Sequence, residues 1–175
     1  MGNMKEIVAI AASLFLFVGP CAAQPVACPS DANLQGYTSI SAINSEMNTE
    51  LSRIAGGGTP EDSYLYILCP NTDFNAVAEP LIPVLSGASF TCGADGASSN
   101  NCKVIGGIEQ VRIADSTVAT YPLSQVSFSG ITFEGFGNTD DATGTSVNGM
   151  AASTTTATFQ DVLWRVSGYS RKWVP

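Results

Sequence analysis

Two segments in the C-terminal half of the chain share one pattern of apolar positions. Each has three apolar residues at spacings of three and then two: Phe128, Ile131 and Phe133 in the first, Phe159, Val162 and Trp164 in the second. A regular strand buries every second residue, so this spacing changes the buried face once. Both sides of the change stay buried only where the strand bends. The pattern therefore predicts a bulge or corner at Ser129–Gly130 and at Gln160–Asp161.

A third copy of the pattern is predicted upstream, at Ile108, Val111 and Ile113. The copies begin at residues 108, 128 and 159, and Gly/Ser/Asn-rich turns lie between them. Repeated bent strands of this kind are typical of solenoids, in which parallel coils stack and insertions leave at the turns. The sequence therefore predicts an all-β fold, a parallel β-helix or β-solenoid.

One amphipathic helix is predicted within residues 37–58, because apolar residues recur there at spacings of three and four. Ser39 or Ser41 is expected as its N-cap, and the glycines at 56–58 are expected to end it. We interpret it as an N-terminal capping α-helix that covers the open apolar end of the solenoid; a partner-binding helix is the alternative. The apolar stripe consists of Ile40, Ile43, Met47, Leu51 and Ile54.

Residues 1–23 have the pattern of a secretory signal peptide. Lys5 precedes an apolar run at 7–18, Gly19–Pro20 breaks the run, and small residues follow it. A membrane anchor is the alternative, but the run is shorter than the ~20 apolar residues that span a bilayer. We expect a cleaved signal, a secreted, extracellular protein and no stable membrane anchor after cleavage.

The remaining chain has a length that suits one domain. We expect an N-terminal arm at 24–36, the capping helix at 37–58 and the β-helix coils at 59–175. The chain ends soon after a strongly apolar strand, and no second capping helix follows. Because an uncapped end would expose a sheet edge and apolar core, the coils are expected to be truncated at the C-terminus.

Four cysteines follow the predicted signal peptide: Cys28, Cys69, Cys92 and Cys102. An even number in an exported chain predicts two disulfides, which allows three pairings. We prefer Cys92–Cys102, which would close a small polar loop, together with Cys28–Cys69, which would tie the arm to an early strand. A bond from Cys69 to Cys92 is the alternative. The chain has no C-x-x-C motif, so a zinc site is not favoured.

Composition excludes several function classes. The chain contains no histidine, which removes Ser-His-Asp and Cys-His catalysis and His-ligated zinc. Its net charge of −8 argues against binding to nucleic acid or to anionic membranes, since both attract positive charge. No cofactor is expected.

The two bent segments, VSFSGITFEG at 126–135 and ATFQDVLWRV at 157–166, resemble the right-handed single-stranded β-helix, or pectin lyase-like, superfamily. The segments LCPN at 68–71 and CGADGASSNNC at 92–102 look similar to secreted, uncharacterised algal-type members. The resemblance covers roughly residues 37–167 and implies a right-handed coil. Its motifs are structural, so they support the fold far more than an activity.

Polysaccharide-cleaving enzymes of that superfamily use acidic residues on neighbouring coils with a histidine, or a basic residue, often with calcium. Asp140 and Asp141 are adjacent in one loop, whereas glycoside hydrolysis needs two carboxylates ~5–10 Å apart across a sugar. No catalytic residue is therefore assigned. Further charged residues would converge only through an unusual stacking of strands; they are Glu109, Arg112, Asp115, Glu134, Asp161 and Arg165.

Two weaker candidate sites remain. Asn138, Asp140 and Asp141 offer oxygen ligands for calcium, but their spacing is not that of a calcium loop, and a solvated loop is the preferred interpretation. Aromatic residues that could stack on sugars occupy the periodic positions, where we expect core instead. They are Phe128, Phe133, Phe159 and Trp164.

The expected function is non-catalytic: a carbohydrate-associated or cell-surface protein with a binding or structural role. The expected partner is a polysaccharide or cell-wall glycan. A polysaccharide lyase or glycoside hydrolase is the alternative, distinguished by charged side chains that converge within hydrogen-bond reach of one sugar.

Overall fold

The computed structural model describes residues 23–113, 125–135, 145–149 and 156–165, with the backbone alone for 145–149. It begins with the antiparallel pair β1 (Val26–Cys28) and β2 (Asp31–Gly36), followed by helix α1 (Ile40–Ala55). The next elements are β3 (Tyr64–Leu68), β4 (Asp73–Asn75), β5 (Ala88–Cys92), a short 3-10 helix (Ser98–Asn100), β6 (Cys102–Ile105) and β7 (Glu109–Ile113). The last are β8 (Gln125–Ser129), β9 (Ile131–Glu134), β10 (Thr145–Gly149), β11 (Thr156–Gln160) and β12 (Leu163–Arg165).

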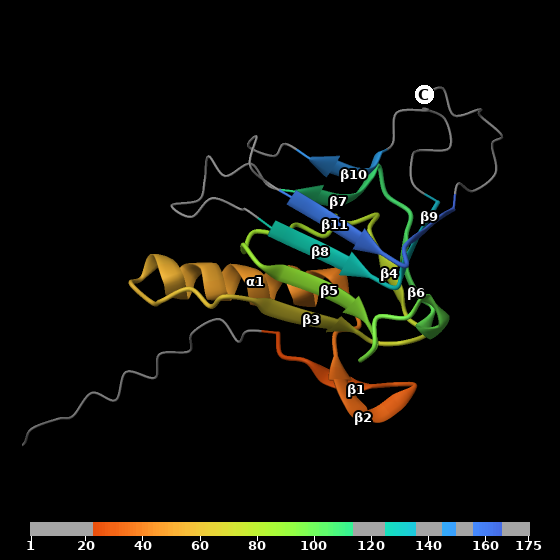
Figure 1. Ribbon diagram of the computed structural model, residues 1–175, viewed down its shortest axis with the longest axis horizontal. Coiled ribbons are helices and arrows are strands. Elements are labelled where there is room, and N and C mark those ends of the chain that lie inside the picture. Colours follow the sequence, from red (N-terminus) through yellow and green to blue (C-terminus); the bar gives the residue numbers. More distant parts are fainter. Residues whose placement is uncertain (1–22, 114–124, 136–144, 150–155, 166–175) are drawn as a thin grey trace, which may run out of the picture.

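The strands after α1 pair in parallel (Figure 1). One sheet has the order β11-β8-β5-β3, the second has the order β12-β9-β6-β4, and β10 lies beside β7 as a separate pair. Each strand of the first sheet is followed in the chain by one strand of the second, for example β8 by β9. The two large sheets therefore advance in step, layer by layer.

Aromatic side chains align at one register position across the first sheet. Phe128 on β8 pairs with Phe90 on β5 and with Phe159 on β11, and Phe90 pairs with Tyr66 on β3. From Tyr66 to Phe159 the successive ring centroids lie 5.3, 5.2 and 5.1 Å apart, with the rings nearly parallel. We call this series the aromatic ladder. It fixes the register, because a slip of one residue would move each ring to the opposite face of the sheet.

A residue with positive φ lies at the corner between the two sheets in every layer. Asn71, Asn101, Gly130 and Asp161 have φ angles of 55°, 57°, 70° and 50°. They separate β3 from β4, β5 from β6, β8 from β9 and β11 from β12. Gly, Asn and Asp adopt this left-handed conformation most readily. The corners predicted from the sequence next to Gly130 and Asp161 are confirmed.

Helix α1 is shorter at each end than the segment predicted for it. Ser39 is its N-cap, and the Ala42 N–H donates to Ser39 Oγ over 3.2 Å. Asn44 ties the helix to a neighbouring segment: its Nδ2 donates to Pro80 O over 2.9 Å and its Oδ1 accepts from Ile82 N–H over 3.0 Å. The apolar stripe packs into the core, with Leu51 partly buried and Ile40, Ile43, Met47 and Ile54 buried.

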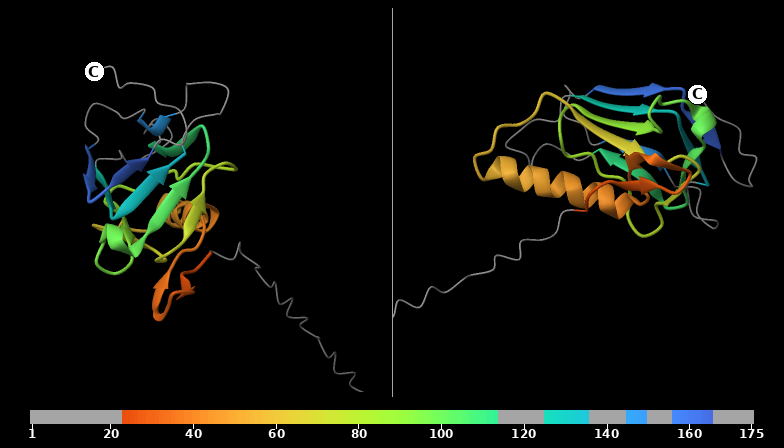
Figure 2. Two further views of the ribbon diagram at one scale, coloured as in Figure 1. Left: turned by 90° about the vertical axis from the view of Figure 1, so that its right-hand side faces the viewer. Right: turned by 90° about the horizontal axis from the view of Figure 1, so that it is seen from below.

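The predicted fold class, an all-β right-handed parallel β-helix with an N-terminal capping helix, is wrong. The described strands form two parallel four-stranded sheets, one antiparallel pair and one parallel pair beside a single helix, and no described sheet closes or curls (Figure 2). This is the arrangement of a small α/β-type domain. The apolar spacing shows where a strand bends, but it carries no information on whether successive sheets close around a common axis.

The third copy of the strand pattern, predicted at Ile108–Ile113, is also wrong. Ile108 is 61 % exposed, and β7 pairs with β10 rather than with β8 or β11. The layer next to Phe128 and Phe133 is formed by Phe90 on β5 and Val104 on β6. A loop separates β5 from β6, so their apolar residues do not show the spacing of three and then two.

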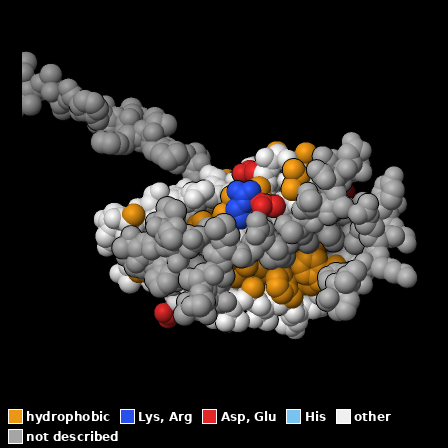
Figure 3. Space-filling model, turned by 90° about the horizontal axis from the view of Figure 1, so that it is seen from above, with side chains coloured by type: hydrophobic (Ala, Val, Ile, Leu, Met, Phe, Trp, Pro, Cys, Tyr) orange, Lys and Arg blue, Asp and Glu red, His pale blue; other side chains and the backbone are white. Residues whose placement is uncertain are grey.

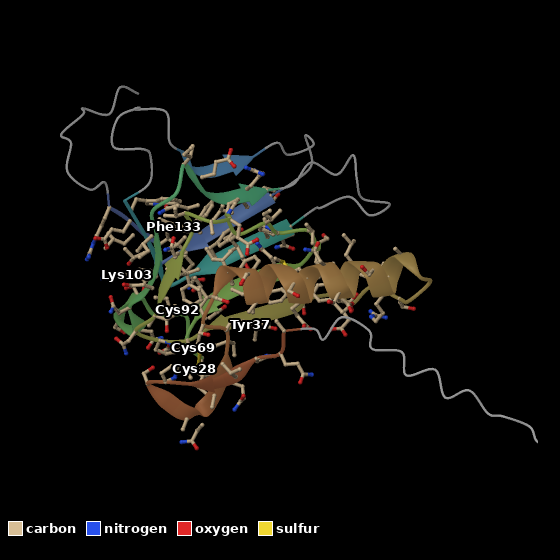
Figure 4. All side chains as sticks on the ribbon, turned by 180° about the vertical axis from the view of Figure 1, so that it is seen from behind. Cys28, Tyr37, Cys69, Cys92, Lys103 and Phe133 are labelled. Atoms are coloured by element: carbon tan, nitrogen blue, oxygen red, sulfur yellow. A yellow bond between two sulfur atoms is a disulfide. The ribbon has the colours of Figure 1, made fainter. Side chains whose placement is uncertain are left out.

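Both disulfides preferred from the sequence are present, Cys28–Cys69 and Cys92–Cys102, with Cα–Cα distances of 5.2 and 5.7 Å. The first ties the β1–β2 hairpin, which forms in the predicted arm, to the chain just after β3. The second closes the loop between β5 and β6 (Figure 4). Constraining the unfolded chain in this way contributes ~2–4 kcal/mol per bond.

Within the described ranges, no helix is long and apolar enough to cross a membrane. The signal peptide predicted at 1–23 lies almost entirely outside the described residues, as does the C-terminal tail on which the expected truncation depends.

Replacing Phe128 by Ala should destabilise the fold by about 3–5 kcal/mol, because its fully buried ring would leave a cavity between two neighbours in the ladder. Phe159→Ala should destabilise it less, since this ring is 39 % exposed. Urea unfolding of both variants measures the difference. Equal losses would show that the ladder is not the main source of core stability.

Gly130→Ala should destabilise the fold more than Gly57→Ala. Both glycines have positive φ, so alanine is strained by ~1–2 kcal/mol at either position. A Cβ at Gly130 would also collide with the backbone of Gly96 and Ala97, whereas nothing lies near a Cβ at Gly57. Thermal unfolding of the two variants tests this. A similar loss for both would mean that the corner backbone gives way.

Candidate functional site

A hollow of about 220 Å³ opens between helix α1 and strand β3. Strand β3 is the edge strand of its sheet, and on its open side the described residues form only an isolated bridge, from Tyr37 to Leu68. We call this feature the Glu–Tyr hollow. It is lined by Tyr37, Glu46, Glu50, Glu61, Ser63, Tyr64, Leu65 and Tyr66.

Backbone pairing fixes the tyrosines of the hollow. The Tyr37 N–H donates to Ile67 O over 2.8 Å, and Tyr37 O accepts from the Cys69 N–H over 2.9 Å. Tyr64 and Tyr66 are two residues apart on β3 and therefore face the same side of the strand, where both are buried. Figure 4 shows Tyr37 between the N-terminal hairpin and α1. The three rings thus come from two segments held together by the sheet.

Glu50 is fully engaged by neighbouring donors. Arg53 Nε donates to Glu50 Oε2 over 2.6 Å, and Arg53 Nη2 donates to Glu50 Oε1 over 2.5 Å. The Tyr64 hydroxyl donates to Glu50 Oε1 over 3.1 Å and accepts from the Glu61 N–H over 2.8 Å. The hydrogen bonds from Arg53 are the main reason that the pKa of Glu50 is lowered, with a smaller effect from Tyr64. Glu50 is therefore ionised and paired.

The hydroxyl groups of Tyr37 and Tyr66 have no hydrogen-bond partner among the described residues, although the two residues are only 5 % and 4 % exposed. The buried unpaired side-chain oxygens in the described ranges belong to Glu46 and Glu134, so both hydroxyls reach open space, which the hollow supplies. Burial, with a contribution from the charge of Glu46, raises the pKa of Tyr37 to about 12. Burial also raises the pKa of Tyr66. Both phenols therefore stay protonated at neutral pH and can donate.

Glu46 lies one helical turn before Glu50 and also lines the hollow. Its Oε2 is buried and accepts no hydrogen bond from the described residues. None of the ion pairs in the described ranges includes Glu46 or Glu61. Leaving a buried acceptor unpaired is unfavourable by ~1–3 kcal/mol, and by more for a charged group. A ligand that brings donors to Glu46 would offset part of this penalty.

The Glu–Tyr hollow combines carboxylate acceptors with phenol groups that donate and accept. This set suits a ligand rich in hydroxyl or protonated amino groups. It does not suit general acid catalysis by Glu50, because its pKa is lowered whereas a general acid needs a raised one. Over the part of the chain that the structure describes, no group of three acidic or cysteine side chains is placed to hold a metal ion.

The charged residues singled out on the strands do not converge on one site. Arg112 Nε donates to Glu109 Oε2 over 2.6 Å within strand β7. Arg165 Nη1 lies 4.0 Å from Glu134 Oε2, on neighbouring strands β12 and β9. These pairs belong to different sheets, so the structure does not bring them together as a lyase site would require.

Asp161 has a structural role. Its Oδ2 accepts from the Ser98 N–H over 2.7 Å, and this hydrogen bond lowers the pKa of Asp161. It thereby connects the corner of the β11–β12 layer to the disulfide-closed loop. The remaining predicted candidates lie outside the described residues: Asp115 and the calcium candidates Asn138, Asp140 and Asp141.

The aromatic residues predicted as core divide into two groups. Phe128 and Phe133 are fully buried, as expected, whereas Phe159 and Trp164 are 39 % and 41 % exposed. The exposed pair lies on β11 and β12, the last described strand of each large sheet. Figure 3 shows hydrophobic side chains gathered on this upper face, next to atoms that are not described. The core prediction is therefore wrong for Phe159 and Trp164.

None of the residues of the Glu–Tyr hollow is a candidate from the sequence alone. A signal exists in retrospect: Glu46 and Glu50 are four residues apart on one helix face, and Tyr64 and Tyr66 share one face of a strand. Each pattern by itself is that of an ordinary solvated or core surface. Only the contact between α1 and β3 places them around one hollow.

Comparison with known proteins found no match to the chain: no family model, no curated protein and no solved structure. Membership of the pectin lyase-like superfamily therefore stays a prediction, and the function of the chain has to be inferred from the geometry of the Glu–Tyr hollow.

Glu50→Gln should make the stability of the protein less sensitive to acid. Because the folded-state pKa of Glu50 is lowered, its contribution is complete above the unfolded-state pKa of about 4.3 and is lost as the pH falls through the folded-state value. Glutamine does not titrate, so the variant lacks this component. Urea unfolding of both proteins between about pH 2 and 6 measures it. Identical pH profiles would contradict the assignment.

Proposed function

We propose that this protein is secreted, that it binds glycans without cleaving them, and that the Glu–Tyr hollow is the binding site. The observation that carries the proposal is the pair of unpaired hydroxyl groups, on Tyr37 and Tyr66, in a hollow lined by carboxylates. Sugar hydroxyls donate and accept, and so they match phenols and carboxylates on both counts. A pocket for an apolar ligand would instead be lined mainly by apolar side chains.

The two disulfides support an extracellular location, because such bonds persist in oxidising compartments. The signal peptide predicted at residues 1–23 agrees with export. An extracellular or cell-wall polysaccharide is accordingly the class of partner, and the net charge of −8 disfavours nucleic acid.

Binding is favoured over cleavage by the state of Glu50. Its two oxygens are occupied by Arg53 and Tyr64, and its pKa is lowered. A lyase or hydrolase would need a free base or a protonated acid beside the scissile bond. The hollow is also small, below the ~300–1,000 Å³ of sites that enclose a drug-sized ligand. It suits one sugar unit of a longer chain.

Replacing both Tyr37 and Tyr66 by Phe should weaken glycan binding by roughly tenfold, since each lost hydrogen bond contributes ~0.5–1.5 kcal/mol. The rings and their packing are retained. Calorimetric titration with oligosaccharides from acidic, neutral and basic polysaccharides measures the affinity. Thr158→Val removes a hydroxyl from β11, at the opposite edge of the sheet, and should leave the affinity unchanged.

The same incubations distinguish binding from catalysis. Intact oligosaccharides recovered after prolonged incubation are expected. Shortened or unsaturated products would replace the proposal with a lyase or hydrolase, and absence of binding across the whole panel would refute it.

A further inference from the structure

Within the proposed glycan-binding function, on which this inference rests, we propose that the Glu–Tyr hollow selects a sugar unit that carries a protonated amino group. The ligand class is an oligomer or polymer of 2-amino-2-deoxy sugars. The proposal rests on the charge of the hollow, on its two buried phenols and on the unpaired oxygen of Glu46.

The hollow carries negative charge that the described residues do not neutralise. Three carboxylates line it, from Glu46, Glu50 and Glu61. The nearby cation, Arg53, is committed to Glu50 through two hydrogen bonds and to Thr59 O through a third of 2.8 Å. The other ion pairs in the described ranges join Arg112 to Glu109 and Arg165 to Glu134, on other strands. Glu46 and Glu61 are thus available to a cationic ligand.

The phenols add a second, independent requirement for a ligand. Tyr37 and Tyr66 are more than nine-tenths buried, and their hydroxyls have no partner in the described ranges although both residues line the hollow. An ammonium group alone would satisfy Glu46 through its three N–H donors, but it has no acceptor to offer these hydroxyls. A sugar hydroxyl or ring oxygen supplies that acceptor. The combination therefore fits an amino group and hydroxyl groups on one ligand.

Other ligand classes fit the hollow less well. An acidic sugar would bring its carboxylate against those of Glu46 and Glu61. A neutral sugar would take the carboxylates out of water without supplying a counter-charge, which is unfavourable. A metal ion needs convergent ligands, and the described residues contain no such group. An amino sugar is the class that meets both the charge and the hydrogen-bonding requirement.

The test compares two oligomers that share linkage and length and differ only in N-acetylation. The secreted full-length protein is titrated with glucosamine oligomers and with fully N-acetylated glucosamine oligomers at about pH 5.5, where both the amino groups and the glutamates are charged. The glucosamine oligomers should bind at least about tenfold more tightly, because charge-assisted hydrogen bonds exceed neutral ones. Ethanolamine, an amine with one hydroxyl and no ring, forms the third arm and should bind much more weakly.

Variants locate the selectivity. Glu46→Gln should reduce the preference for the glucosamine oligomer to within about twofold, while leaving binding of the N-acetylated oligomer almost unchanged. Asp62→Asn is the matched control: it removes the same charge from an exposed neighbouring position that does not line the hollow, and it should keep the full preference. Circular dichroism of each variant confirms folding before titration.

The outcomes separate this inference from the function on which it rests. If no glycan binds, the proposed function fails. If both oligomers bind equally, or if Asp62→Asn removes the preference as Glu46→Gln does, the function stands and the amino-sugar inference is overturned. If ethanolamine binds as tightly as the glucosamine oligomer, the hollow recognises amines in general and the sugar assignment is overturned.

Discussion

The architecture depends on the parallel register of the strands, and that register is held by the aromatic ladder. Neighbouring strands lie ~4.7–4.9 Å apart, so identical register positions bring rings to nearly the same separation. The ring centroids from Tyr66 to Phe159 are spaced at 5.1 to 5.3 Å, which is this constraint expressed in side chains. The left-handed corners then pass the same register to the second sheet, where Phe133 stacks on Trp164 at 4.7 Å. Two sheets therefore share one alignment.

The ladder also explains where a functional site can form. Its inner members, Phe90 and Phe128, are fully buried, and a hydroxyl there would lack a partner at a penalty of ~1–3 kcal/mol. At the β3 end the stack continues through Tyr66 to Tyr37, whose ring centroids lie 5.8 Å apart. These hydroxyls escape the penalty because they open into the Glu–Tyr hollow. The change from Phe to Tyr along one stack thus coincides with the change from core to binding surface.

The sequence predicts local features well and their closure badly. The spacing around Gly130 and Asp161 requires a bend, and the structure has left-handed residues at those corners. The apolar stripe of α1 and both disulfides also follow from local pattern and parity. The fold class does not, because spacing along the chain cannot show whether sheets close. The partner of Phe128 was hidden for a related reason: the loop between Phe90 and Val104 interrupts the pattern that would have identified it.

The hollow was beyond sequence reasoning because its charge balance is set by tertiary contacts. Three glutamates and one arginine in this region have an obvious local pairing, since Glu50 and Arg53 lie three residues apart on α1. That pairing has a consequence that only the structure reveals: it uses the nearby cation, and β3 then brings two buried phenols against the carboxylates that remain. An unpaired oxygen on Glu46 is tolerable in such a fold because the ladder and the disulfides supply stability elsewhere. Local pairing of one glutamate therefore creates the selectivity of the other two.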